Sequence, residues 1–314
     1  MSFSSKLKHE LCNLPQSDRH CELAELAGII NTCGNIYTNR QTYSVSIQTE
    51  NAIVAKRFYS IAKKMNINCE VTVKNNRQFK KNRIYAVVIN EEQSSRKLLQ
   101  ATGLLIFKDR QNILKKQINK MLVKSSCCKR SYIRGAFISG GYLSNPEKNY
   151  HLEFVSSEYD LSVQLSEIIN FFNLNSKVIE RKNNYVVYLK ESESIVDLLN
   201  VMGAHSSLMN LENVRIIKDM RNNVNRIVNC ETANINKTVS AAVKQIEDII
   251  FVKNTKGLQF LPATLEQVAI LRLENSDATL KEIGAMLTPA IGKSGVNHRL
   301  RKISEIAENL RGGI

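Results

Sequence analysis

Two periodicities of hydrophobic and polar positions divide the N-terminal two thirds of the chain into short segments. In residues 41–50, Tyr43, Val45 and Ile47 alternate with polar side chains, which is the period of a strand with one buried and one exposed face. In residues 51–65, apolar positions recur at intervals of three and four, which predicts a helix with one inward face. The pattern therefore predicts a mixed fold of helices and half-buried strands.

The predicted elements occur twice. After a short helix over residues 5–13, the first copy comprises helices 21–33, 51–65 and 91–99 and strands 41–50, 68–74 and 83–90. The second copy comprises helices 128–140, 158–172 and 192–201 and strands 150–155, 176–181 and 185–190. A constant shift of 107 residues superimposes Cys21 on Cys128, Gly28 on Gly135, Gly34 on Gly141 and Tyr43 on Tyr150. Two copies are too few for a solenoid, so we predict one α+β domain with pseudo-twofold symmetry, each half having the order α-β-α-β-β-α.

After the second copy, the composition and the spacing of apolar residues change. Residues 211–237 are rich in Asn and Arg with sparse apolar positions, which indicates a connector or an exposed helix. Helical spacing returns over residues 236–250, 265–273, 280–287 and 294–310. We therefore predict a repeated domain over residues 1–213 (repeats about 21–104 and 128–204), a connector over 214–235, and an all-α domain over 236–314.

The end of the all-α domain has the pattern of a helix-turn-helix motif over about residues 275–308. Asp277 or Thr279 can cap a short helix, Pro289 and Gly292 interrupt it, and Ser294 can cap the next helix. The apolar positions of that last helix, at helical spacing, are Val296, Leu300, Ile303 and Ile306. The opposite face and the start of the helix present the candidate DNA-binding residues Lys293, Ser294, Asn297, His298, Arg299, Arg301 and Lys302.

These residue types suit DNA. Arg and Asn make bidentate contacts to guanine and adenine in the major groove, where the second helix of such a motif lies. Lys293 and the helix start around Ser294 suit phosphate. Residues 283–304 contain no acidic side chain that would repel phosphate. The alternative is a solvated helix of a small bundle, whose charges only face water.

The overall charge favours a polyanionic partner. The chain of 314 residues has a formal net charge of +15 and a pI near 9.5, which for a soluble protein usually indicates nucleic acid. Residues 1–230 hold 33 of the 44 Lys and Arg residues but only 20 of the 29 acidic ones. Most of the excess charge therefore lies outside the all-α domain, which favours an auxiliary DNA contact from the repeated domain.

Within the repeats, residues 26–34 and 133–141 resemble the nine-residue helix signature of LAGLIDADG homing endonucleases. The resemblance implies two signature helices packed side by side, each ending in an acid that holds Mg²⁺. Here those positions are Cys33 and Gly140, which cannot supply the oxygen ligands that Mg²⁺ needs. We therefore expect no catalytic residues and no nuclease activity. The family's DNA-facing sheet would place Ser44, Ser46 and Gln48 toward DNA, and His151 and Glu153 in the second copy.

Several further blocks make the whole chain similar to the WhiA family of bacterial regulators. They are residues 134–137 (RGAF), 150–153 (YHLE), 188–191 (YLKE), 229–234 (NCETAN) and 293–299 (KSGVNHR). The resemblance implies a degenerate homing-endonuclease-like domain joined to a helix-turn-helix, and a non-catalytic regulator that binds double-stranded DNA. It further implies roles in sporulation, or in cell division and chromosome segregation, with regulatory protein partners. The alternatives are a protein-interaction scaffold with weak tethering DNA binding, and a residual metal-dependent endonuclease.

Other classes of function find little support. The sequence has no apolar run long enough for a membrane span and no secretory signal. The seven cysteines contain no CxxC pair, so we expect reduced thiols in a cytoplasmic, nucleoid-associated protein, with a metal cluster as the less favoured alternative. The histidines do not cluster with Cys or Asp along the sequence, and there is no phosphate-binding Gly-rich loop with a Lys. We therefore predict no metal, no cofactor and no small-molecule substrate.

Overall fold

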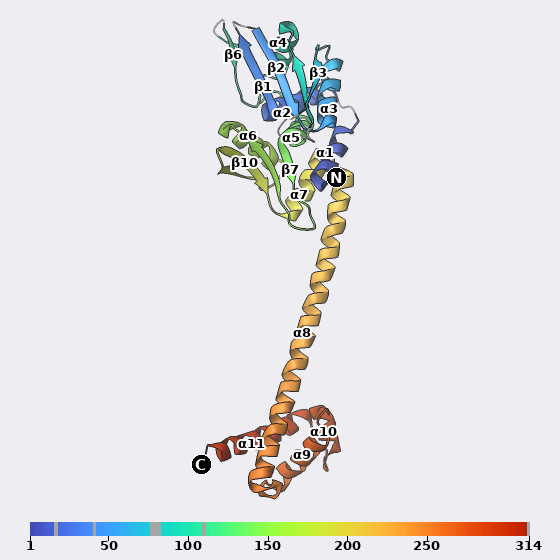
Figure 1. The fold of residues 1–314 in the computed structure, drawn as a ribbon, viewed down its shortest axis with the longest axis vertical. Coiled ribbons are helices and arrows are strands. Elements are labelled where there is room, and N and C mark those ends of the chain that lie inside the picture. Colours follow the sequence, from blue (N-terminus) through green and yellow to red (C-terminus); the bar gives the residue numbers. More distant parts are fainter. Residues whose placement is uncertain (16–17, 40–41, 76–82, 109–110, 313–314) are drawn as a thin grey trace. The chain divides into compact units, whose positions relative to one another are not determined.

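The computed structural model describes residues 1–15, 18–39, 42–75, 83–108 and 111–312. The chain divides into two compact units, residues 1–218 and 219–314 (Figure 1). No helix in the described ranges is long and apolar enough to cross a membrane.

The first unit contains two copies of one arrangement, each with a four-stranded antiparallel sheet. The first copy comprises α2 (Arg19–Cys33), β1 (Gly34–Asn39), β2 (Thr42–Thr49), α3 (Ala52–Lys64), β3 (Glu70–Asn75), β4 (Arg83–Ile89) and α4 (Glu92–Ala101). The second comprises α5 (Ser126–Gly140), β7 (Gly141–Leu143), β8 (Leu152–Ser156), α6 (Tyr159–Asn170), β9 (Lys177–Arg181), β10 (Asn184–Leu189) and α7 (Ser192–Met202). The strand orders are β1-β2-β4-β3 and β7-β8-β10-β9, so the two-repeat α+β prediction is confirmed.

The predicted order within each copy was one strand short. β1 pairs with β2 from Gly34 opposite Ile47 onward, and β7 pairs with β8 from Gly141 opposite Phe154. β1 is an edge strand that is mostly exposed, and β7 has only three residues. Neither segment carries a run of alternating apolar positions, and each follows a signature helix directly. A helix α1 (Phe3–Cys12) precedes the repeats, and a hairpin of β5 (Leu105–Lys108) and β6 (Gln111–Leu114) separates them.

The signature helices α2 and α5 lie side by side in the middle of the first unit's core. On β2 the predicted inward residues Tyr43, Val45 and Ile47 are buried, and α3 and α4 pack against this sheet (Figure 1). A Cβ atom added to Gly28 would lie 2.4 Å from the carbonyl oxygen of Tyr132, and one added to Gly135 would lie 2.1 Å from that of Glu25. The close approach of the two backbones therefore requires glycine at both pseudo-equivalent positions.

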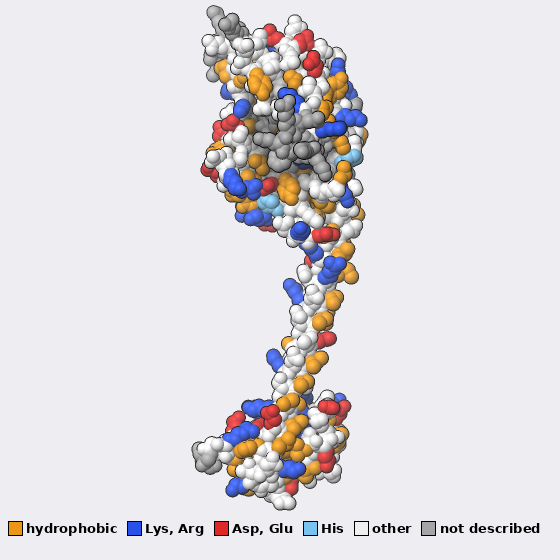
Figure 2. Space-filling model, viewed as in Figure 1, with side chains coloured by type: hydrophobic (Ala, Val, Ile, Leu, Met, Phe, Trp, Pro, Cys, Tyr) orange, Lys and Arg blue, Asp and Glu red, His pale blue; other side chains and the backbone are white. Residues whose placement is uncertain are grey.

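The segment expected as a connector or an exposed helix lies inside one long helix, α8 (His205–Lys256), of 52 residues. Residues 205–256 contain no Pro and no Gly, so nothing in the segment breaks a helix, although Asn is a poor helix former. Along its middle part, apolar side chains such as Ile217, Met220, Val224 and Ile227 are exposed (Figure 2).

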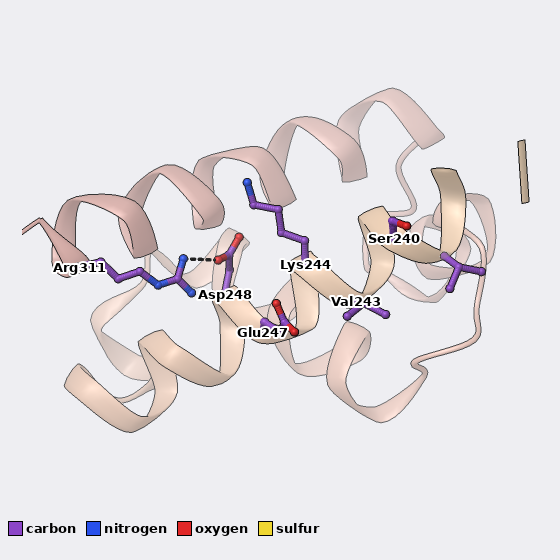
Figure 3. A pocket seen from close by; sticks show the side chains of 7 residues that line it. Ser240, Val243, Lys244, Glu247, Asp248 and Arg311 are labelled. Atoms are coloured by element: carbon purple, nitrogen blue, oxygen red, sulfur yellow. Dashed lines mark hydrogen bonds and ion pairs between the residues drawn. The ribbon is translucent and has the colours of Figure 1, made fainter. Parts of the chain in front are cut away.

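The second unit packs three helices against the end of α8. They are α9 (Ala263–Glu274), α10 (Leu280–Met286) and α11 (Lys293–Arg311), with a 3-10 turn at Leu258–Phe260. α8 contributes Ile249 and Val252 to the core of this unit. Figure 3 shows a surface hollow between α8 and α11, where Arg311 Nη1 donates to the buried carboxylate of Asp248 at 2.8 Å. This ion pair fixes the C-terminal end of α11 to α8.

Candidate nucleic-acid interface

Two local features fix the start of α10 and the turn that follows it. Thr279 caps α10, accepting from the backbone N–H of Glu282, whose carboxylate accepts the Thr279 N–H at 2.7 Å in return. Gly284 packs against the following turn: an added Cβ would lie 2.2 Å from the Ile291 carbonyl oxygen. The Ile291 N–H donates to the Gly284 carbonyl at 3.0 Å. The capping box fixes the start of α10, and the close approach of Gly284 to Ile291 fixes the turn that leads into α11.

The inner face of α11 is the predicted one. Val296, Leu300 and Ile303 are at most 1% exposed, Ala307 is fully buried, and Ile306 is partly buried against the same core. α11 packs against α9 and α10, in one core with Ile249 and Val252 of α8. The orientation of α11 about its own axis is therefore fixed by packing, which also fixes what its outer face presents.

The outer face presents most of the predicted residues at the N-terminal half of α11. Ser294, Asn297, His298 and Arg301 are exposed and follow the i, i+3, i+4, i+7 spacing of a single stripe. Lys293 and Lys302, also exposed, lie beside this stripe. Their side chains converge on one surface because residues at this spacing lie above one another on a helix.

Two details at this surface differ from the sequence prediction. The N-cap of α11 is Gly292, not Ser294, and it makes no side-chain capping bond. The first N–H groups of α11 are thus free of a side-chain cap, as an anion site at a helix start requires. Arg299 is only partly exposed and donates from Nη1 to the Thr264 carbonyl oxygen at 3.3 Å, at the start of α9. It lies at the flank of α11 and does not share the outer stripe.

Charge along α11 is divided between its two halves. All basic candidates precede residue 303, whereas the exposed Glu305 and Glu308 follow, and Glu308 accepts from Lys244 of α8 at 3.5 Å. On the face of the second unit drawn in Figure 2, Lys and Arg side chains are interspersed with acidic ones. The positive end of the helix dipole adds to the basic residues at the N-terminal half. The candidate residues for phosphate contact on α11 therefore all lie in the first turns of this helix.

On the first sheet, only part of the predicted auxiliary set reaches the surface. Gln48 is exposed and Ser44 is half-buried, but Ser46 is 6% exposed, lying between Asn35 of β1 and Val88 of β4. Ser46 is central in the sheet, so its short side chain is covered by its neighbours. Ser46 alternates with the core residues Val45 and Ile47 and so lies on the polar face of β2, but it is covered, and a DNA contact from Ser46 stays a prediction.

In the second copy, the carboxylate of Glu153 is paired with two neighbouring side chains. It accepts from His151 Nε2 at 2.9 Å and from Arg181 Nη2 at 3.2 Å. Burial acts to raise the pKa of Glu153, but these two hydrogen bonds outweigh it and the pKa is lowered. Its negative charge is thus offset within the sheet.

The ends of the signature helices lack the acids that the nuclease family has there. Cys33 is half-buried, and burial raises the pKa of its thiol to about 12, so it is uncharged at neutral pH. Gly140 has no side chain, and the Thr32 methyl group occupies the space next to it, 2.2 Å from an added Cβ. The nearby Glu158 pairs with Lys116 at 3.0 Å. These residues do not form a site for a hard divalent cation.

Two groups of residues in the first unit were not anticipated. The buried carboxylate of Glu25 on α2 accepts from Arg57 on α3 and from Arg134 on α5, which joins the two repeats. The expectation that the histidines do not cluster with cysteine is also wrong. His20 and Cys21 meet Cys127 and Cys128, with one ligand atom of each lying within 4.8 Å of all the others. The 107-residue shift that superimposes Cys21 on Cys128 was the available signal for this second group.

Comparison with known proteins gives a consistent result along the whole chain. Three family models match: a WhiA N-terminal LAGLIDADG-like domain over residues 19–105, a WhiA LAGLIDADG-like domain over 129–221, and a WhiA C-terminal HTH domain over 224–307. A protein of Clostridium botulinum (strain Hall) named "Probable cell division protein WhiA" is 50% identical over 318 residues, covering 100% of both chains. A protein of the same name from Alkaliphilus oremlandii is 49% identical and covers 100% of this chain and 99% of that protein.

Two solved structures agree with these matches. The crystal structure of full-length DUF199/WhiA from Thermatoga maritima has a TM-score of 0.61 at 26% identity, covering 98% of this chain and 99% of that one. The N-terminal LAGLIDADG domain of DUF199/WhiA has a TM-score of 0.51 at 22% identity, covering 64% of this chain and 90% of that one. The second likeness concerns the fold of the repeated domain alone.

Proposed function

The chain belongs to the WhiA family, and on that premise we propose that it is a sequence-specific, non-catalytic DNA-binding regulator of transcription. Its relatives are named probable cell division proteins, which supports a link to cell division; chromosome segregation and sporulation are the further roles that the family resemblance implies. Such a role places the protein with the chromosomal DNA in the cytoplasm.

The observation that carries this proposal is the exposed stripe on the first turns of α11. Asn297 and Arg301 lie one turn apart on this stripe, and they are the two types suited to bidentate contacts with adenine and guanine. Lys293 and Lys302 flank the stripe and suit phosphate, as do Ser294 and the N–H groups at the helix start. His298 lies on the same face and is a further contact residue.

The absence of cleavage is proposed from the ends of the signature helices. With an uncharged thiol at Cys33 and no side chain at Gly140, the pair offers no oxygen ligands for Mg²⁺ beside a phosphate. Incubating the full chain with duplex DNA and Mg²⁺ or Mn²⁺ tests this directly. Site-specific nicks that require the protein would overturn the non-catalytic assignment.

The DNA-binding site is tested with full-length variants on a duplex selected from chromosomal fragments by retention. The pair Asn297→Ala and Arg301→Ala removes two base contacts, each worth about 1–3 kcal/mol, so affinity should fall at least roughly 30-fold. Lys253→Ala, an exposed lysine in the last turn of α8, is the control and should bind as the parent does. Unchanged binding of the double variant would move the site away from α11.

Phosphate contacts are distinguished by their salt dependence. Lys302→Ala should weaken binding to all sequences alike and reduce the slope of log affinity against log salt by about 0.9. Arg299→Ala should have the smaller effect of the two, because Arg299 is engaged with the Thr264 carbonyl. Equal salt slopes for parent and Lys302→Ala would remove Lys302 from the proposed interface.

A second role for the repeated domain, as a scaffold for protein partners, is favoured by its exposed strands. Tyr37, Val71 and Val73 on β1 and β3 are 55%, 47% and 53% exposed, and apolar side chains of this kind are more typical of protein contacts than of a phosphate surface. Replacing Val71 and Val73 by Ser should leave DNA affinity unchanged under this role. A loss of DNA affinity would instead indicate that the sheet contributes to DNA binding.

A further inference from the structure

At the start of the two signature helices, four potential metal ligands come together. His20 and Cys21 lie in the first turn of α2, and Cys127 and Cys128 lie in the first turn of α5. His20 Nδ1 is 3.1 Å from Cys128 Sγ and 3.3 Å from Cys21 Sγ, and all four ligand atoms lie within 4.8 Å of one another. From these residues we infer that the protein holds a structural zinc ion with a Cys₃His ligand set.

The spacing of the four atoms is close to that of a tetrahedral zinc site. Zn–S bonds of about 2.3 Å and Zn–N bonds of about 2.0–2.1 Å give edges of roughly 3.5–3.8 Å between ligand atoms. The two separations of His20 Nδ1 from sulfur, 3.1 and 3.3 Å, are slightly shorter than these values, and no pair of the four ligand atoms is more than 4.8 Å apart. Small rotations of the side chains are sufficient to place all four around one ion. Three thiolates and an imidazole favour zinc over the oxygen-preferring Mg²⁺ and Ca²⁺.

A neighbouring carboxylate is placed as in other zinc sites with histidine ligands. His20 Nε2 lies 3.5 Å from Asp18 Oδ2. A proton on Nε2 shared with this carboxylate leaves the lone pair of Nδ1 directed at the three sulfur atoms. Metal-binding histidines usually have such a partner on the second ring nitrogen, which fixes the tautomer and the ring orientation.

The surrounding helices favour an anionic centre at this point. The contact of Cys21 and His20 with Cys128 at one end, and of Thr32 with Gly140 at the other, shows that α2 and α5 run in the same direction. The positive ends of both helix dipoles therefore meet at the cluster, and neither Asp18 nor Ser125 makes a side-chain capping bond there. A zinc ion with three thiolates and a neutral histidine has a net charge of −1 and offsets this repulsion.

The site is closed by protein ligands yet open to entry of the ion. Cys21 and Cys128 are each 5% exposed, whereas His20 and Cys127 are exposed. Four protein ligands leave no position for a substrate, which is the arrangement of structural zinc. Because two ligands come from each repeat, the ion would clamp the two halves of the first unit at the end of the helix pair remote from Cys33 and Gly140.

The inference is tested by the metal content of the full-length protein, purified in a reducing buffer. Elemental analysis should find one zinc ion per chain, and Cys127→Ser and Cys128→Ser should each lose it. Cys69→Ser and Cys230→Ser, which alter a half-buried and an exposed cysteine elsewhere, should keep it. Cys127 is exposed, so the Cys127→Ser variant should retain the parent's circular dichroism even if Cys128→Ser does not.

Replacement of zinc by Co²⁺ gives a second readout. The parent and the two control variants should show the visible absorption of tetrahedral cobalt together with thiolate-to-cobalt charge transfer, and the two cluster variants should lose both. Chelation of the ion should shift the thermal midpoint of the first unit downward. The inference is overturned if the reduced parent takes up no stoichiometric zinc or cobalt, or if mass spectrometry finds a disulfide among these cysteines in place of a metal.

Discussion

The buried charge network of Glu25 gives the sharpest test of how the two repeats are joined. Glu25 is fully buried on α2, and its two oxygen atoms accept from Arg57 Nε at 2.7 Å and Nη2 at 3.1 Å. The second oxygen also accepts from Arg134 Nη1 at 3.2 Å. The change Glu25→Gln keeps the size of the side chain but removes the charge and turns an acceptor into a donor that faces guanidinium N–H groups.

The expected loss in the free energy of unfolding follows from the two arginines that lose their carboxylate partner. Removing one partner of a buried ion pair costs about 3–5 kcal/mol because an uncompensated charge stays buried. The lower end applies here, since Gln keeps one acceptor oxygen, and since Arg57 and Arg134 also donate to the carbonyl oxygens of Leu14 and Met202. A loss of about 3 kcal/mol corresponds to a fall of roughly 6–12 °C in the unfolding midpoint of a unit of this size.

The chain offers both a selective probe and a matched control. All ten Tyr residues lie in residues 1–218 and there is no Trp, so intrinsic tyrosine fluorescence reports the unfolding of the first unit alone. The control is Glu22→Gln on the same helix: the Glu22 carboxylate is buried, but its partner Lys64 has a side chain 44% exposed. Lys64 can be rehydrated, so this variant should lose only about 1 kcal/mol or less. Equal midpoints for the two variants would refute the reasoning.

Two further predictions concern close contacts and pH. Gly135→Ala should destabilise the first unit by about 3 kcal/mol, since its Cβ would meet the Glu25 carbonyl oxygen at 2.1 Å. Gly140→Ala should lower the stability less, because the Thr32 side chain that its Cβ would meet can rotate away. Thermal unfolding followed by tyrosine fluorescence measures both variants, and equal losses of stability would contradict the argument. In the second unit, hydrogen bonds from the Thr279 backbone and side chain hold the pKa of Glu282 below its usual value of 4.5. The stability from the capping box is therefore fully present above pH 4.5 and lost as pH falls through the lowered pKa. The protection of the α10 amides from hydrogen exchange, measured relative to the intrinsic exchange rate at each pH, should fall over this range in the parent but not in Glu282→Gln. The same pH dependence of protection in both would refute the role of Glu282.

Where local pattern and tertiary packing agree, the sequence was sufficient to predict the structure. The alternation of Tyr43, Val45 and Ile47 predicted β2, because that strand has one face in the core. The edge strand β1 was missed because most of its positions are exposed, so its pattern carries no period. For the middle of α8, the high Asn and Arg content of residues 211–237 left a connector and an exposed helix as alternatives. The absence of Pro and Gly proved to be the better guide to this helix.

In the candidate interface, too, some features follow from the local sequence pattern and others depend on tertiary packing. The apolar spacing of Val296, Leu300 and Ile303 predicted the buried face of α11, and most of the exposed residues follow from it. Arg299 could have been set apart by the same spacing, since it is i+3 from Val296 and i−4 from Ile303, close to the inner face. Its bond to the Thr264 carbonyl depends on where α9 lies. The cysteine and histidine cluster likewise depends on the packing of α2 against α5, which no local spacing encodes.

The signature helices α2 and α5 make their closest contact at their centre, and the packing residues there are distinct from the positions at which the nuclease family has its acids. At their centre, Gly28 and Gly135 permit a backbone approach that a methyl group on either would prevent. Next to this contact, Glu25 on α2 binds Arg134 on α5, so the interface also carries a buried ion pair. The glycines and the ion pair belong to packing, and their loss would separate the two repeats whether or not the protein cuts DNA. Cys33 and Gly140 lie beyond this contact, at the ends of the two helices, where Gly140 meets the Thr32 side chain, so neither the glycine contact nor the ion pair depends on an acid at these positions.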